Sequence, residues 1–255
     1  MTEKAAAPVS AEEKAKSIPT PPGWGEDKLS EFLQRVQKNQ LGSFVNFRAE
    51  FELLREVDDC FVKIAENLLN PRKNILSVLL LHRSHAAYLA ACGTSMAGQV
   101  PETFVLLRSC LEYSGYALLI HRDNELGVLW LNRHEDQAAF RKMRKEFQAI
   151  KVERTIIAVD AELGRIYSDF YNRAIDFGGH PNTRGVTGSM KMEETPDLKQ
   201  YLQVYLHGDD MARRHALQST AQVGVCSLHI FQHILPERFI LLGIRDRLIG
   251  LRGRW

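Results

Sequence analysis

The segment from Pro101 to Arg122 constrains this chain more than any other, because it is apolar on nearly every side of a helix. Its large apolar residues leave no solvent-facing stripe: Phe104, Val105, Leu106, Leu107, Leu111, Tyr116, Leu118, Leu119 and Ile120. A helix of this kind lies in the centre of a protein and must be covered by other helices. We therefore predict that the rest of the chain packs around this segment.

Apolar residues recur at intervals of three and four along the flanking segments, which predicts further helices. Pro, Gly and Asp mark their ends. In chain order we expect helices at 27–40, 44–69, 73–96, 101–122, 152–176, 209–234 and 237–251, with a short apolar segment at 126–131. We expect Gly42 and Ser43 to end the first helix, and the third and fourth to form an antiparallel hairpin at the core.

The pattern changes after Phe177, where Gly178, Gly179 and Pro181 favour a loop. Residues 188–193 and 198–206 then come closer to a period of two, which is typical of a small β-hairpin. The sequence therefore predicts an all-α, up-and-down helical bundle with a small irregular or hairpin insertion after Phe177.

Residues 1–26 carry Ala, Lys, Glu and Pro and almost no large apolar side chain, so we expect a disordered tail there. We expect residues 27–255 to form a single helical domain. The net charge of +2 is too small for the protein as a whole to attract nucleic acid or anionic lipid. Any such binding requires a local patch.

The four cysteines, Cys60, Cys92, Cys110 and Cys226, are widely spaced and lie in apolar helical contexts. This spacing disfavours a disulfide framework or a zinc knuckle. The sequence shows no apolar signal-peptide core, and no uninterrupted apolar run approaches the roughly 18 residues that span a bilayer. We expect a soluble cytoplasmic protein with no membrane partner.

Arg108 and Glu112 lie in the middle of the apolar central segment, one helical turn apart. An isolated surface pair prefers the acidic residue first, and here the order is reversed. We expect both side chains to reach toward other helices rather than only toward each other. They either form a buried structural network that fixes helix register, or they belong to a binding or catalytic site.

A second group of polar residues lies at the end of the predicted helix at 152–176 and in the loop after it: Tyr167, Tyr171, Arg173, Asp176, His180 and Asn182. Functional groups concentrate on irregular backbone, and His is suited to proton transfer near neutral pH. The alternative is that His180 only hydrogen-bonds loop carbonyls.

Six residues separate Arg173 from His180, a spacing that resembles the Arg-to-His motif of HEPN-type ribonucleases. Those proteins are small all-helical dimers, in which the Arg holds the phosphate and the His helps to activate the ribose 2′-hydroxyl. The resemblance implies that Arg173 and His180 are catalytic. The family favours a polar residue directly after the Arg, and here Ala174 stands there.

A broader order of features spans roughly residues 45–235: Arg108 and Glu112 on an apolar helix, then Trp130, then Tyr171 and a His-Pro loop. This order is similar to bacterial helical domains of unknown function that look distantly HEPN-like. This broader resemblance implies a helical fold and supplies no reaction of its own. The HEPN-like character implies a bacterial homodimer that acts on RNA without a metal. Arg108, Glu112, Tyr171, Asn182 and Trp130 would then line or support the cleft.

The sequence lacks the motifs of the common enzyme classes. The sequence has no P-loop, dinucleotide glycine motif, Gly-x-Ser-x-Gly elbow or HExxH, so we expect no cofactor. The pairs His229–His233 and His82–His85 could each share a helix face, but the Glu-x-x-His motifs of di-iron bundles are absent. We expect no metal.

Basic clusters at 141–145 and 245–254 have nearby aromatic residues, Phe140, Phe147 and Trp255. They are either phosphate contacts for RNA or ordinary solvated helix faces. The leading hypothesis is a HEPN-like protein that acts on RNA. The alternative is a non-catalytic helical interaction or ligand-binding module, in which Arg108 and Glu112 are structural.

Overall fold

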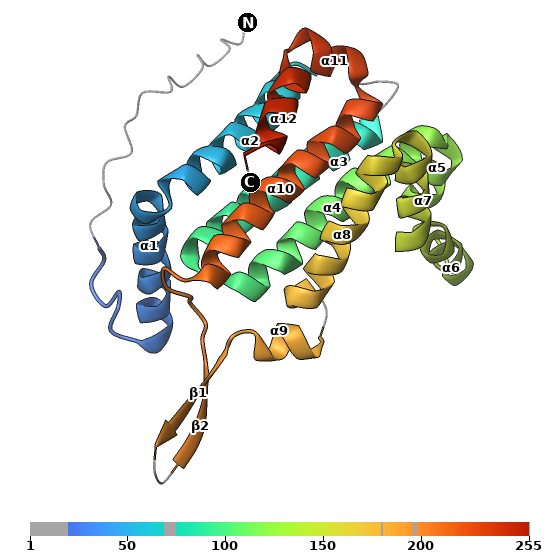
Figure 1. Cartoon of the computed structure of the whole chain (residues 1–255). Helices are drawn as coiled ribbons and strands as arrows, with labels where there is room; N and C mark the ends of the chain where they lie inside the picture. The colour runs from blue at the N-terminus through green and yellow to red at the C-terminus, as the bar shows by residue number, and fades with distance from the viewer. Residues whose placement is uncertain (1–19, 69–74, 180, 196–197, 255) are drawn as a thin grey trace, which may run out of the picture.

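The computed structural model of the chain describes residues 20–68, 75–179, 181–195 and 198–254 (Figure 1). It confirms an all-α bundle, since helices dominate and the described strands form one small two-stranded sheet. The helices of the N-terminal half are α1 (Lys28–Asn46), α2 (Arg48–Glu66), α3 (Ile75–Ala97), α4 (Val100–Arg122) and α5 (Asn124–Leu131). Those that follow are α6 (Gln137–Glu146), α7 (Ala149–Val159), α8 (Ala161–Ala174), α9 (Thr183–Thr187), α10 (Met211–Ile234), α11 (Pro236–Leu241) and α12 (Ile244–Arg252).

Helix α4 is central, as its apolar sequence predicts. It packs along α3 and α10 and also contacts α5, α7 and α8. Phe104, Leu107 and Leu111 on this helix are almost fully buried. The expectation that no part of α4 faces solvent is wrong at its N-terminal end, where Val105 is 46% exposed.

The hairpin of α3 and α4 turns at Gly98, which has a φ of +82°. The carbonyl of Gly98 accepts a hydrogen bond from the backbone N–H of His207 at 2.8 Å. A Cβ atom on Gly98 would lie 2.3 Å from the His207 carbonyl oxygen, so only glycine fits here. The segment that leads into α10 is thereby fixed to the end of the core hairpin.

The insertion after Phe177 contains the expected β-hairpin. A π-helical turn (Ile175–Gly179) and α9 precede β1 (Met190–Thr195) and β2 (Leu198–Gln203). The strands are antiparallel, with Met192 opposite Tyr201. This hairpin projects from one end of the bundle (Figure 1).

The predicted boundary between the first two helices is wrong, because α2 begins at Arg48 and not at 44, and so is the single helix expected at 152–176. Helix α1 continues through Gly42 and Ser43 to Asn46, because the buried hydroxyl of Ser43 donates to the carbonyl of Met96 at 2.7 Å and holds this stretch against α3. The helix expected at 152–176 is instead two helices. Asp160 is extended and its carboxylate accepts from the N–H groups of Glu162 and Leu163, so it begins α8 as an N-cap.

Asp210 begins α10 in the same way, as expected, by accepting a hydrogen bond from the Arg213 N–H at 2.9 Å. All four cysteines are free thiols, as their spacing predicts.

By length and composition alone, helix α3 could cross a membrane, although His82, Arg83 and His85 interrupt its apolar run. It packs against α1, α2, α4 and α10, and core helices of this kind meet the same criterion. His82, Arg83 and His85 lie at its centre. The absence of a membrane partner stays a prediction.

Candidate functional site

Arg108 and Glu112 lie on one face of α4 and form an ion pair, with 2.9 Å between Nε and Oε1. Their side chains are 29% and 34% exposed, so neither is sealed in the core. Glu112 also accepts a hydrogen bond from the hydroxyl of Tyr171 on α8, at 3.0 Å. The expected link to another helix therefore exists, but the two charges also bind each other.

These three side chains line a cavity of about 430 Å³, which we call the polar cavity. Its walls come from α4, α6, α7 and α8. Its polar and aromatic lining residues are Arg108, Glu112, Tyr116, Arg144, Phe147, Gln148, Tyr167 and Tyr171.

Helical spacing explains how the polar cavity forms. Arg108, Glu112 and Tyr116 follow one another at intervals of four on α4, and Tyr167 and Tyr171 do the same on α8. Facing helices thus bring two rows of side chains together. The Tyr167 and Tyr171 rings stack with centroids 5.9 Å apart, and the Arg108 guanidinium lies 5.4 Å from the centre of the Tyr171 ring.

The charge balance of the polar cavity is positive, because Arg108 and Arg144 face a single carboxylate, Glu112. Burial raises the pKa of Tyr171 to about 12, and the neighbouring Glu112 carboxylate acts in the same direction. The Tyr171 hydroxyl is therefore a neutral hydrogen-bond donor at physiological pH.

Arg173, predicted to be catalytic, is not among the residues that line the polar cavity. Its Nη1 donates to Oε1 of Gln222 on α10 at 3.1 Å, and its guanidinium lies 5.2 Å from the centre of the Phe170 ring. It therefore lies on a different side of α8 from Tyr171. His180, its predicted partner, lies outside the described residues.

Asn182 has a structural role as the N-cap of α9. Its Nδ2 donates to the carbonyl of Ile175 at 2.6 Å, and its Oδ1 accepts from the N–H of Gly185 at 2.8 Å. These bonds cap α9 and hold it against the preceding turn. The structure does not bring Asn182 to the polar cavity.

Trp130, a predicted supporting residue, is half-buried on α5 and packs against the core. The Arg133 guanidinium lies 4.6 Å from the centre of a Trp130 ring. Trp130 does not line the polar cavity. Of the predicted residues that the structure describes, Arg108, Glu112, Tyr167 and Tyr171 meet there.

Sequence reasoning missed Tyr116 and Gln148 as parts of this site, and treated Arg144 only as one of a basic run. For Tyr116 a signal existed, because it stands one turn after Glu112 on the same helix. For Gln148 no signal existed, since its position depends on how α6 and α7 turn back toward α4.

One member of each histidine pair considered for a metal lies beside a carboxylate. His85 lies 2.6 Å from Asp58 and stacks on the Phe61 ring, and His233 lies 3.9 Å from Asp160. Within the described ranges, no group of three or more His, Cys, Asp or Glu residues is placed to hold a metal ion.

Comparisons with protein-family models, with curated proteins and with solved structures found no match to this chain. The resemblance to HEPN-type ribonucleases therefore stays an expectation from sequence. The function has to be argued from the geometry of the site itself.

Proposed function

We propose that this chain is a helical ligand-binding protein, and that the polar cavity binds a small anionic molecule with a planar ring. The observation that carries this proposal is the convergence of Arg108, Glu112 and Tyr171 from two helices into one open cavity. A volume of about 430 Å³ lies within the range of about 300–1,000 Å³ that small-molecule sites occupy.

The chemistry of the lining supports an anion with a ring. Arg108 and Arg144 supply guanidinium groups, which bind phosphate or carboxylate through paired hydrogen bonds. The aromatic rings of Tyr116, Tyr167 and Tyr171 supply apolar faces on which a planar group can pack. Glu112, paired with Arg108, holds that guanidinium in place before a ligand arrives.

Binding of adenosine monophosphate, followed by isothermal titration calorimetry, tests this proposal. Adenosine and inorganic phosphate are the partial probes. We expect the nucleotide to bind and each partial probe to bind at least about tenfold more weakly, which corresponds to about 1.4 kcal/mol. The proposal is wrong if none of these compounds, nor benzoate as a ring-bearing carboxylate, binds at millimolar concentration.

Helix α6 offers a matched pair of variants. Arg144 lines the polar cavity, whereas Arg141 lies on the same exposed helix outside it. We expect Arg144→Gln to weaken nucleotide binding about tenfold or more, because one charge-assisted contact is lost. Arg141→Gln removes the same charge from the same helix and should leave binding unchanged.

A second candidate function is RNA binding, as the HEPN resemblance implies. The observation that favours it is the continuity of the polar cavity with α6, which has no buried residue and carries Arg141, Lys142, Arg144 and Lys145. Phe140 on this helix is 40% exposed and available for stacking on a base. A homodimer and a bacterial cytoplasmic location belong to this second hypothesis.

Fluorescence anisotropy with a labelled single-stranded RNA separates the two candidates. RNA binding predicts that Lys142→Gln and Arg141→Gln weaken binding and reduce its salt dependence, although neither lines the cavity. An RNA cleavage assay in chelator then tests catalysis. Loss of cleavage in both His180→Ala and Arg173→Ala would support a HEPN-like ribonuclease, and an absence of cleavage by the wild type would exclude it.

A further inference from the structure

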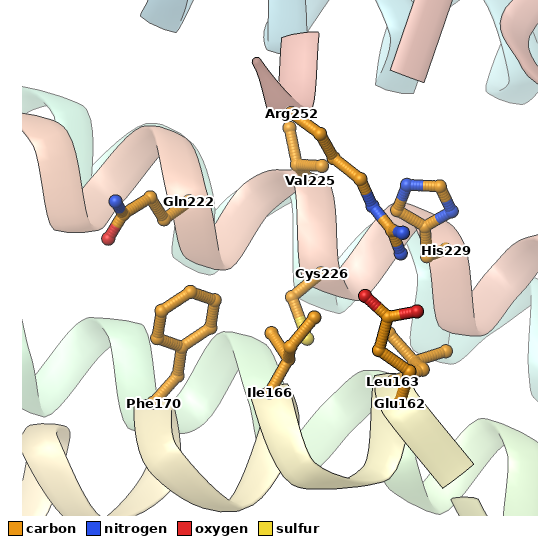
Figure 2. A pocket seen from close by; sticks show the side chains of 9 residues that line it. All are labelled: Glu162, Leu163, Ile166, Phe170, Gln222, Val225, Cys226, His229 and Arg252. Carbon is orange, nitrogen blue, oxygen red and sulfur yellow. The ribbon is translucent and has the colours of Figure 1, made fainter. Parts of the chain in front are cut away.

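A second cavity of about 320 Å³ lies between α8, α10 and α12, and we call it the α10 cavity (Figure 2). It shares no lining residue with the polar cavity. The two cavities use different faces of α8: Tyr167 and Tyr171 line the polar cavity, whereas Ile166 and Phe170 line the α10 cavity.

Most of the α10 cavity is apolar. Leu163, Ile166 and Phe170 project from α8, and Val225 and Cys226 project from α10 (Figure 2). Burial raises the pKa of the Cys226 thiol, so this side chain is an uncharged wall rather than a nucleophile. A ligand that fills this part of the cavity must therefore present an apolar group.

Charged groups gather at the other end. The guanidinium of Arg252 and the carboxylate of Glu162 point toward the same space as the imidazole of His229, away from Phe170 (Figure 2). Both charged residues are exposed. In the part of the chain that the structure describes, neither Arg252 nor Glu162 forms an ion pair, so both charges are available to a ligand.

His229 is a separate observation that indicates a ligand in the α10 cavity. It is only 8% exposed and lines the cavity, yet its Nε2 atom has no hydrogen-bond partner among the described residues. A buried polar atom without a hydrogen-bond partner destabilises the folded protein. Burial, together with the nearby Arg252 and His233, lowers the pKa of His229 to about 4, so at neutral pH the ring is uncharged. A polar ligand atom would satisfy it.

We infer that the α10 cavity binds a free α-amino acid with a large apolar side chain. The ligand carboxylate pairs with Arg252 and hydrogen-bonds Nε2 of His229, the ammonium pairs with Glu162, and the side chain lies along Phe170 and Ile166. A singly charged ligand fits less well. A simple carboxylate would face Glu162, and a simple amine would face Arg252.

Calorimetric titration with L-leucine tests this inference. The two control probes are 4-methylpentanoate, which lacks the ammonium, and 3-methylbutylamine, which lacks the carboxylate. We expect leucine or phenylalanine to bind and each control to bind at least about tenfold more weakly. If neither amino acid binds at millimolar concentration, the inference is wrong. If 4-methylpentanoate binds as tightly as leucine, the ligand does not need an ammonium group and the assignment of a zwitterionic ligand is wrong.

Variants locate the site. We expect Arg252→Gln and Glu162→Gln each to reduce leucine affinity at least about tenfold without altering stability, because both side chains are exposed. Arg254→Gln on the same C-terminal segment and Asp169→Asn on α8 are the matched controls, since neither residue lines the cavity. Unchanged affinity in Arg252→Gln contradicts the inference. Nucleotide binding at the polar cavity should survive Arg252→Gln, so the two proposals fail or succeed separately.

Discussion

The hydroxyl of Tyr171 donates to the Glu112 carboxylate, and this bond ties α8 to the middle of the central helix. Tyr171→Phe removes this bond and keeps the aromatic ring. We expect it to lower the free energy of unfolding by about 1 kcal/mol, because the acceptor is charged but partly exposed to water. Urea denaturation measures this. Tyr201→Phe on the exposed strand β2 is the control, and an equal effect of both changes would show that the Tyr171–Glu112 bond does not stabilise the fold.

Arg213 is a buried charge at the start of α10. It is 2% exposed, pairs with Asp209 at 3.2 Å, and donates to the carbonyls of Asn39 and Met96. Arg213→Met leaves these partners without their donor, and we expect a loss of about 3 kcal/mol in unfolding free energy.

The neighbouring Arg214 is a matched control for Arg213. Its side chain is 50% exposed and pairs with Glu50 at 3.4 Å. Glu50 is only 12% exposed, so Arg214→Met should cost about 1 kcal/mol, the upper end for an exposed pair and clearly less than the loss expected at Arg213. Guanidinium denaturation of both variants gives the comparison, and similar midpoints would contradict the structural role assigned to Arg213.

Gly164 allows α7 and α8 to pack closely. A Cβ atom there would lie 2.3 Å from Cγ1 of Ile157 and 2.9 Å from its Cα atom. Helix propensity alone predicts that Gly164→Ala stabilises α8 by about 1 kcal/mol. The contact with Ile157 reverses this sign, and we expect a loss of about 1–3 kcal/mol.

Gly250 on α12 tests the same substitution where space is open, because a Cβ atom there meets nothing within 4 Å. Gly250→Ala should raise the unfolding free energy by roughly 0.5–1 kcal/mol. Thermal unfolding of the two variants should therefore shift in opposite directions. A gain in both would show that the α7–α8 contact is looser than the distances indicate.

The centre of the fold was predictable from sequence because burial follows from composition. The apolar stretch around Leu107 and Leu111 allows no other position than the core, and Asp210 gives a clear helix start. Asp160 carries the same signal, followed by Glu162 in the first turn. It was missed because apolar residues on both sides of it keep a helical spacing.

The candidate sites were less predictable, because each depends on how separate helices meet. Arg108 and Glu112 stood out by their charge in an apolar helix, and Tyr171 by its place near a loop. By contrast, Glu162, His229 and Arg252 come from three helices. His229 stood out only as a possible metal ligand with His233, and Arg252 only as one of a basic cluster. Only packing brings them together, so no spacing in the sequence could indicate them.

The depressed pKa of His229 links stability to pH. Its pKa falls from 6.5 to about 4, mainly through burial and then through Arg252 and His233, while Asp160 acts in the opposite direction. Between these values the unfolded chain binds a proton that the folded protein does not. The stability contributed by this group is therefore complete above about pH 6.5 and decreases as the pH falls, by about 2 kcal/mol at pH 5.

His229→Gln removes this dependence. Urea denaturation from pH 7.5 to pH 5 should give a flatter curve of unfolding free energy for His229→Gln than for the wild type, whatever their difference at neutral pH. His82→Gln, on the exposed side of α3, should follow the wild-type curve. Parallel curves for all three proteins would mean that His229 is protonated in the folded state at pH 5. Its ring would then be a charged group at the α10 cavity rather than a neutral one.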